Sequence, residues 1–155
     1  MKNKFIFFVS IFFLYISEID TSAVEDFIFE SKSIEIEKNN NIIAKDGVKV
    51  NTSDGLEIFA DKSEYNKNTK ILKLDGSVKI FDKIQNFEIN SDKIIYDKIL
   101  EKITSKTNTN IIIDNSHIIS GKNIIFFKTK LEIQSNEPST IKDKFNNLIK
   151  LKGFN

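Results

Sequence analysis

The sequence of 155 residues offers few side chains that could perform chemistry, and they are scattered. His117 is the only histidine and stands next to Ser116, a pair that suggests a serine nucleophile with its general base. Neighbouring residues of a strand point to opposite faces, so these two side chains would not converge on one substrate. We interpret His117 as a surface or turn residue and predict no catalytic residue.

Metal and cofactor chemistry finds no support either. The absence of cysteine excludes thiolate metal sites, thiol nucleophiles and disulfides. Asp61 and Asp92 suggest a metal site or a general acid, but they occupy matched places in separate repeats without EF-hand spacing. We interpret both as turn residues that bond backbone amides. With no Gly-rich phosphate-binding loop in the chain, we predict no metal, no cofactor and no enzymatic activity.

The charge balance argues against nucleic acid as a partner. All 23 basic residues are lysines, and 22 acidic residues oppose them, which leaves a formal net charge of +1. No single-sign field would draw the whole molecule onto a polyanion. A hydrophobic content of 40% over this length suffices for one domain with its own core.

The N-terminus resembles a secretory signal peptide spanning residues 1–23. Lys2 and Lys4 precede an apolar run over residues 5–16, and Thr21-Ser22-Ala23 places small side chains at a cleavage site. A retained membrane anchor is the alternative. Twelve apolar residues rise only about 18 Å as a helix, however, against a hydrocarbon core of roughly 30 Å. We therefore expect export and cleavage after Ala23.

The elements of the mature chain are predicted to be strands. Apolar and polar residues alternate at 34–36, 48–50, 56–58, 72–74, 78–80, 87–89 and 131–133, and period two is typical of half-buried strands. Turn signals separate them, including Asp46-Gly47, Asp54-Gly55, Asp75-Gly76 and Ser120-Gly121. We expect eight to eleven short strands in a domain over residues 24–138. The strand array should end at Pro138, and residues 139–155 form a C-terminal tail or the start of a further strand.

An internal repeat of about 30 residues is the strongest signal. The pairs Ser31-Lys32, Ala60-Asp61, Ser91-Asp92 and Ser120-Gly121 open successive units at steps of 29, 31 and 29 residues. Tyr65 and Tyr96 take matched positions, and we interpret both as structural, with the ring in the core and the hydroxyl at its rim. One hairpin cannot bury its apolar face alone, so stacked units must share an interior. This predicts a folded-over sheet, a sandwich or an open barrel.

The central units, Ala60-Asp61 to Tyr65-Asn66 with Gly76-Ser77-Val78-Lys79-Ile80 and Ser91-Asp92 to Tyr96-Asp97, resemble the OstA family of lipopolysaccharide-transport jelly rolls. The resemblance covers residues 27–135. It implies an all-β fold, a twisted β-jelly roll made of an open, folded-over antiparallel sheet of hairpin repeats. It further implies lipopolysaccharide (lipid A) as a partner, with its acyl chains in an apolar groove. It places the mature chain in the periplasm, with an association with the outer membrane left open.

Alternation predicts which side chains point inward. Ten of them are candidates for the lipid groove: Val50, Ile58, Leu74, Val78, Ile80, Phe87, Ile89, Tyr96, Ile113 and Phe126. The remaining nine are expected to point inward as well, so that all nineteen form the core and the groove together: Ile43, Val48, Leu56, Leu72, Ile94, Ile111, Ile124, Leu131 and Ile133. Lys49, Lys79 and Lys93 stand near strand ends and are candidates for contact with anionic head groups.

Three interpretations stay open at this level. The chain is an LptA-type periplasmic bridge protein, which the short signal favours. Alternatively it is the N-terminal domain of an LptD-type outer-membrane assembly protein, because residues 141–153 resemble the stretch that follows that domain. The third is a β-repeat protein-interaction module without lipid. In the transport interpretations, strands at 27–36 and 124–133 would pair edge to edge with other jelly-roll components of the transport bridge.

Overall fold

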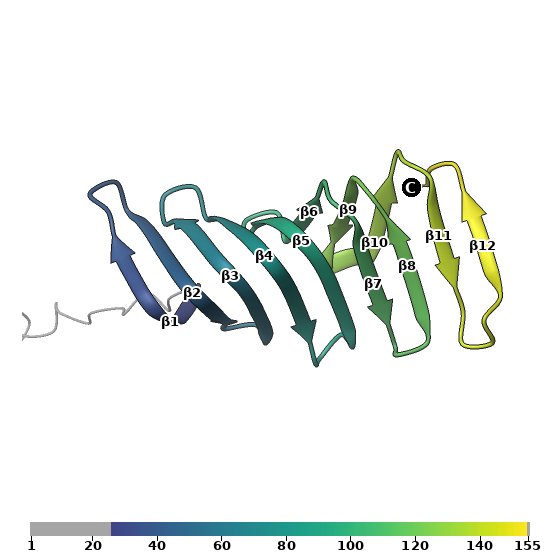
Figure 1. The fold of residues 1–155 in the computed structure, drawn as a ribbon, viewed down its shortest axis with the longest axis horizontal. Helices are drawn as coiled ribbons and strands as arrows, with labels where there is room; N and C mark the ends of the chain where they lie inside the picture. Colours follow the sequence, from purple (N-terminus) through teal and green to yellow (C-terminus); the bar gives the residue numbers. More distant parts are fainter. Residues whose placement is uncertain (1–25, 155) are drawn as a thin grey trace, which may run out of the picture.

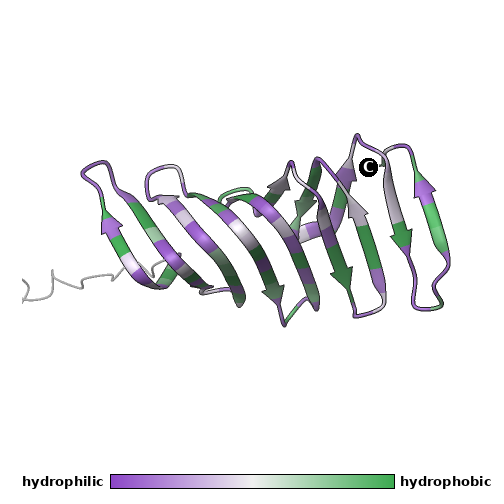
Figure 2. Ribbon diagram, viewed as in Figure 1, coloured by the Kyte–Doolittle hydropathy of each residue, from purple (hydrophilic) through white to green (hydrophobic). Residues whose placement is uncertain are grey.

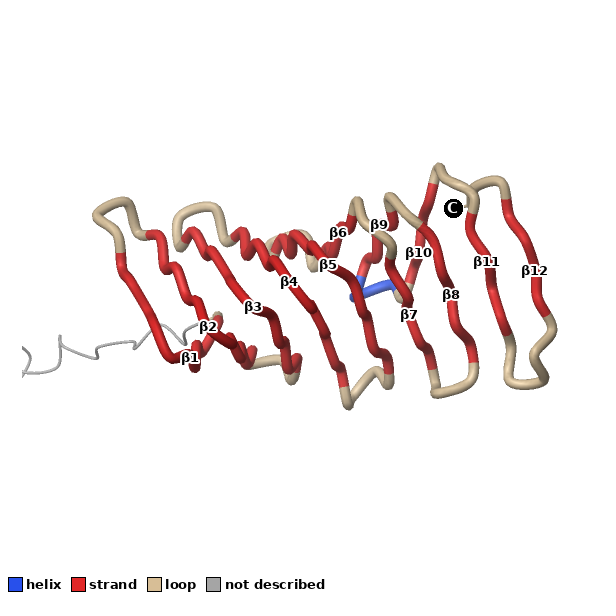
Figure 3. The backbone as a smooth tube through the Cα atoms, viewed as in Figure 1, coloured by secondary structure: helices blue, strands red, loops and turns tan. Residues whose placement is uncertain are grey.

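The fold is a single twelve-stranded antiparallel sheet, seen in a computed structural model that describes residues 26–154. The strands follow one another along an elongated molecule (Figure 1). Their bounds are β1 Phe27–Ile36, β2 Asn41–Thr52, β3 Leu56–Asn66, β4 Ile71–Asp82, β5 Phe87–Asp97, β6 Lys102–Ser105, β7 Thr109–Ile113, β8 His117–Gly121, β9 Ile124–Phe127, β10 Glu132–Ser135, β11 Ser139–Lys142 and β12 Leu148–Leu151. One short 3-10 helix, η1 (Lys128–Lys130), joins β9 to β10 (Figure 3). The predicted all-β architecture is therefore confirmed.

The sheet folds over into two arms that face each other. Each of the long strands β1 to β5 contributes one half to each arm. Arm A consists of residues 27–31, 48–52, 56–60, 78–82 and 87–91 of these strands, together with β7, β8, β11 and β12. Arm B consists of residues 33–36, 41–45, 62–66, 71–75 and 93–97, together with β6, β9 and β10. Beyond β5 the sheet branches, because β7 pairs with the first half of β5 and β6 with its second half. Short strands then build each arm separately.

A column of β-bulges bends the long strands where the arms meet. Register shifts lie between Ser31 and Ser33 in β1, and at matched places in β2, β3 and β4. An extra residue in one strand bends it and increases its twist, so aligned bulges fold the whole sheet. Gly47 (φ 85°) and Gly76 (φ 78°) occupy the left-handed conformation there. Small residues such as Ala44 and Ser91 line this bend and let the arms approach.

The prediction that Asp46-Gly47 and Asp75-Gly76 are turns between strands is wrong. Both pairs lie inside long strands, β2 and β4, at the bulges. A residue pair that tolerates positive φ suits a bulge as well as a hairpin turn, and the sequence does not separate the two. Asp61 and Asp92 likewise lie at the bend within β3 and β5 and not in turns between strands.

The bulge at Gly76 supplies a first test of this geometry. A Cβ atom at Gly76 would clash with Asp61 Oδ2 and would lie 2.8 Å from Asp61 Cβ. We expect Gly76→Ala to lower the free energy of unfolding by about 2 kcal/mol through backbone strain and this clash. Gly47→Ala, with the same kind of φ but nothing within 4 Å of the new atom, should cost about 1 kcal/mol. Urea unfolding measures both; equal losses would show that the contact with Asp61 has no effect.

The core fills the space between the arms. Hydrophobic and hydrophilic residues alternate along most strands (Figure 2), and the apolar side chains on the inner faces form one buried cluster. Aromatic rings meet across the two arms: the Phe87 and Phe126 centroids are 4.8 Å apart, and those of Phe27 and Tyr65 are 4.7 Å apart. Edge-to-face pairs of this kind add to the stabilisation from burial.

Seventeen of the nineteen residues predicted to point inward are buried or pack against the core, and two predictions are wrong. Ile43 lies on the outer face, because Ile42 and Ala44 fill the inner face of β2. Leu131 is exposed, because it caps η1 in the left-handed conformation outside any strand. Where two apolar residues are adjacent, as in Ile42-Ile43, the sequence pattern alone does not show which of the two side chains points inward.

The strand array does not end at Pro138, and residues 139–155 contain two further strands, in line with the second of the two alternatives for this segment. β11 begins at the next residue and pairs with both β8 and β12, so the sheet continues through most of residues 139–155. Pro138 lies in the connection between β10 and β11, where the chain crosses from arm B to arm A and no ladder donor is needed. After β12 the chain returns to arm B, where Phe154 and Ser135 exchange two backbone hydrogen bonds of 2.7 and 2.8 Å.

Of the two segments predicted to be edge strands, one lies at an edge of the sheet. β1 pairs only with β2 and is an edge, as expected for residues 27–36. Residues 124–133 are not one edge strand, because β9 lies between β6 and β10 and η1 interrupts the segment. The far edge of the described sheet is β12 in arm A.

Candidate functional site

Two apolar ladders line the interior between the arms. In arm A, cross-strand neighbours give the series Phe29, Val50, Ile58, Ile80, Ile89, Ile111, Ile119 and Ile141. In arm B they give Ile36, Ile42, Tyr65, Leu72, Tyr96, Ile103, Phe126 and Ile133. Neighbouring strands of an arm contribute one residue each to its ladder, and all these side chains point inward because the facing alternates along every strand. The interior is therefore an uninterrupted apolar track along the molecule.

The structure brings the ten candidate groove residues together on this interior. Ile113 is partly buried, and the other nine are less than 5% exposed: Val50, Ile58, Leu74, Val78, Ile80, Phe87, Ile89, Tyr96 and Phe126. In the middle of the molecule these side chains pack on one another. A ligand could share that space only if the arms moved apart.

The end of the interior at β1 is more open. A hollow of about 460 Å³ lies there, with Phe27 and Phe29 from arm A and Ile34 and Ile36 from arm B in its wall. Ile34 is 46% exposed and Ile36 is 74% exposed, although both belong to the inner face by register. Arm B at β1 thus presents apolar side chains that the protein itself does not cover.

A cluster of partly or fully buried charges closes the mouth of the fold. The mouth is the side opposite the bend, where the strand ends of the two arms face each other. Asp54 of arm A accepts hydrogen bonds from Lys98 (3.0 Å) and Lys128 (2.6 Å) of arm B, both through Oδ2. Lys128 also lies 3.7 Å from Asp82 and from Glu101. Glu101 in turn accepts from Lys98 at 2.6 Å. We call these five residues the mouth cluster.

The mouth cluster borders the apolar core through Tyr96. Its ring is fully buried, and its hydroxyl donates to Glu101 at 2.7 Å. Burial, and next the neighbouring Glu101 carboxylate, raise the pKa of Tyr96 far above its ordinary value. Burial alone would raise the pKa of Asp54, but hydrogen bonds from Lys128, Thr52 and Lys98 outweigh it and lower that pKa strongly. Asp54 is therefore ionised and bound to lysine at neutral pH.

A second ion pair crosses the mouth at the β1 end. Lys70 donates to Asp26 at 2.5 Å, and the hydroxyl of Tyr65 donates to the same carboxylate at 3.2 Å. The hydrogen bond from Lys70 is the main cause of the lowered pKa of Asp26. Sequence reasoning missed both groups of charges. The signal was present, since Asp26, Asp54 and Asp82 are spaced 28 residues apart.

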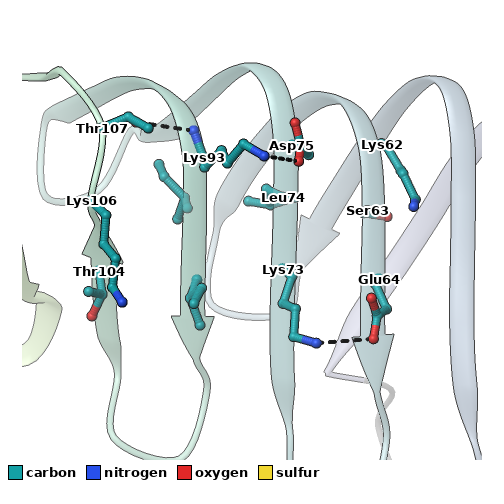
Figure 4. A pocket seen from close by; sticks show the side chains of 12 residues that line it. Lys62, Ser63, Glu64, Lys73, Leu74, Asp75, Lys93, Thr104, Lys106 and Thr107 are labelled. Carbon is teal, nitrogen blue, oxygen red and sulfur yellow. Dashed lines mark hydrogen bonds and ion pairs between the residues drawn. The ribbon is translucent and has the colours of Figure 1, made fainter.

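The three candidate head-group lysines lie on outer faces and not at the mouth. Lys49 and Lys79 flank Phe59 in one cross-strand row of arm A. Lys93 forms an ion pair with Asp75 at 2.8 Å in arm B, beside an outer hollow of about 320 Å³ (Figure 4). The sheet thus separates these lysines from the apolar interior.

The described residues also include side chains of the types that bind metal ions or act in catalysis. Within residues 26–154, no group of three His, Cys, Asp or Glu side chains could hold a metal ion. His117 is exposed at the start of β8, as expected for a surface residue. The expectation that Ser116 and His117 point apart is wrong, because Ser116 lies in the turn before β8 and its Oγ is 2.9 Å from His117 Nδ1. No helix in the described part of the chain has the length and apolar character to cross a membrane. The predicted signal peptide lies outside the described residues.

These features define the class of protein: an open β-jelly roll, one antiparallel sheet folded over a continuous apolar interior. The chain belongs to the family of OstA-like proteins, whose model matches residues 25–146. This is a family of transport proteins and not of enzymes, so the predicted family and the predicted lack of enzymatic activity are both confirmed.

Comparison with solved structures agrees on the fold. The chain is similar to LptH of Pseudomonas aeruginosa, the LptA-homologous periplasmic component of the conserved lipopolysaccharide transport device. The TM-score is 0.63, with 12% sequence identity over 81% of this chain and 93% of that one. At this identity the likeness shows the fold alone. No curated protein matches the sequence.

Proposed function

We propose that this protein carries the acyl chains of lipopolysaccharide through the periplasm, in the manner of an LptA-type bridge. The observation that carries the proposal is the pair of facing apolar ladders, which run across the sheet without a charged residue. Such a track shields hydrocarbon from water along its whole length. The chemistry needed is burial and release, which agrees with a family of transport proteins.

The exposed edge β1 supports a head-to-tail arrangement with other jelly-roll components. Its outer backbone groups have no partner strand within the described sheet, and such an edge can extend a neighbouring sheet. The uncovered Ile34 and Ile36 would be buried in that contact. Pairing at β1 would join two interiors into one track.

Two alternatives are supported by separate observations. The close packing of the middle of the interior favours a protein-interaction module that uses its edges without lipid. The resemblance of residues 141–153 to the stretch that follows the N-terminal domain of LptD-type proteins favours such a domain as the second alternative. In that case the same interior would deliver lipid to an outer-membrane partner.

Light-induced crosslinking in cells tests the lipid proposal. A photoreactive phenylalanine analogue at Phe87, on the inner face, should give adducts with lipopolysaccharide, whereas the same analogue at the neighbouring Glu88, on the outer face, should not. Ile80 and Lys79 form a second matched pair in β4. Adducts at neither inner position, in protein shown to be folded and exported, would favour the interaction module.

A further inference from the structure

Within residues 26–154, the mouth cluster is a group of partly or fully buried ionisable side chains that the packing of the sheet alone does not explain. Lys128 is 7% exposed, and Lys98 keeps 15% of its side chain exposed. Burying lysines in this way is costly unless carboxylates pair with them. A lysine needed only for a turn could remain in solvent, as the neighbouring Lys130 does.

The cluster lies where the head of an amphiphile would have to be. Tyr96, the ladder residue of β5, touches it through Glu101, and Leu56, two residues after Asp54, is buried in the core. A hydrocarbon chain between the ladders would therefore end at Lys98 and Lys128. Both lysines direct their ammonium groups at a single oxygen, Asp54 Oδ2. Two lysines that converge on one oxyanion are suited to a phosphate oxygen as well.

We propose that Lys98 and Lys128 form a binding site for the phosphate group of an acyl-bearing amphiphile, and that Asp54 occupies this site when no ligand is bound. This inference rests on the proposed lipid function and specifies its head-group contact. Entry of a chain between the arms separates Asp54 of arm A from the two lysines of arm B. The ligand phosphate then takes the place of the Asp54 carboxylate, so that both lysines again have an anionic partner while Asp54 is left to the solvent.

Binding of two probes that differ only in their head group tests the assignment. Because the chain has no cysteine, Ile99→Cys in the exposed turn beside Lys98 accepts a single environment-sensitive fluorophore. Monomeric hexadecyl phosphate and hexadecanol are titrated into this labelled chain. We expect the phosphate to bind about tenfold more tightly, since charge-assisted hydrogen bonds to the lysines are available only to it.

Asp54→Asn removes the competing carboxylate and separates the possible outcomes. We expect the affinity for hexadecyl phosphate to rise about fivefold and that for hexadecanol to change less than about twofold. Adding Lys98→Met to Asp54→Asn should abolish the gain. Asp46→Asn, which removes the same charge at the exposed bulge of β2, serves as the control and should change neither affinity.

Each outcome bears on a different proposal. Equal gains for both probes would mean that Asp54→Asn only opens the mouth, and this overturns the phosphate site while the lipid function stands. No gain for hexadecyl phosphate, with both probes still bound, overturns it as well. If neither probe binds the wild-type chain or the variants, the proposed lipid function falls with it.

Discussion

Replacing Lys128 with methionine is expected to lower the free energy of unfolding by about 3 kcal/mol at neutral pH, because the change leaves buried carboxylates without their cation. Methionine keeps the length of the side chain, so the loss is mainly electrostatic. Asp54 would keep Lys98 as a partner, but Asp82, whose side chain is 1% exposed, would lose the ammonium group that lies 3.7 Å from it. Urea unfolding monitored by circular dichroism measures the loss.

The pH dependence of this loss identifies its cause. The folded-state pKa of Asp54 lies below the ordinary value of 3.8, so its pairing contributes stability above that pH and loses it as the pH falls toward the folded-state pKa. The difference between wild type and Lys128→Met should therefore be full at neutral pH and shrink below about pH 4, where the Asp54 carboxylate of the variant is protonated. A difference that stayed constant down to pH 3 would indicate lost packing instead.

Two variants control for this interpretation. Lys130→Met changes an exposed lysine of the same short helix and should alter stability by less than about 0.5 kcal/mol. Combining Lys128→Met with Asp54→Asn removes both partners and should recover part of the loss, as a double-mutant cycle of a buried pair predicts. If Lys128→Met cost no more than Lys130→Met, the cluster would not hold the arms together.

Strand content and facing were predictable because they depend on local alternation. Val78 and Ile80, or Phe87 and Ile89, fix the inner face of their strands without any knowledge of partners. The bend was not predictable in the same way. Asp75-Gly76 satisfies the backbone requirement of a hairpin turn and of a bulge equally, and only the pairing of β4 with β3 and β5 decides between them.

In the candidate site, likewise, the part that depends on local alternation was predictable and the part that depends on the folding of the sheet was not. Groove residues such as Ile58 and Tyr96 were found because periodicity reports burial. The mouth cluster was missed because its members come from four separate turns or strand ends, and each alone is an ordinary surface charge in the sequence. Lys93 was chosen for its place near a strand end, but it lies in the middle of β5, opposite the bulge of β4, and therefore at the bend, away from the mouth. Which charges meet depends on how the sheet folds over.

Ile80→Ala is expected to lower the free energy of unfolding by about 3–4 kcal/mol, because it removes three buried carbons from the centre of the arm A ladder. Ile80 is fully buried between Ile58 and Ile89 and faces arm B. Ile149→Ala is the matched control: it belongs to the same ladder by register but is 56% exposed, and should cost less than about 1 kcal/mol.

The ratio of these two losses, measured by urea unfolding, reports whether the arms are closed in solution. Ile80 lies between Ile58 and Ile89 and is covered by arm B, whereas Ile149 lies in the edge strand β12 beside Ile141 and is 56% exposed. A large difference means that the closed interior must open before a chain can enter, as the mouth cluster requires. Similar small losses at both positions would mean that arm B does not cover Ile80 in solution, and lipid could then enter without separating Asp54 from Lys98 and Lys128.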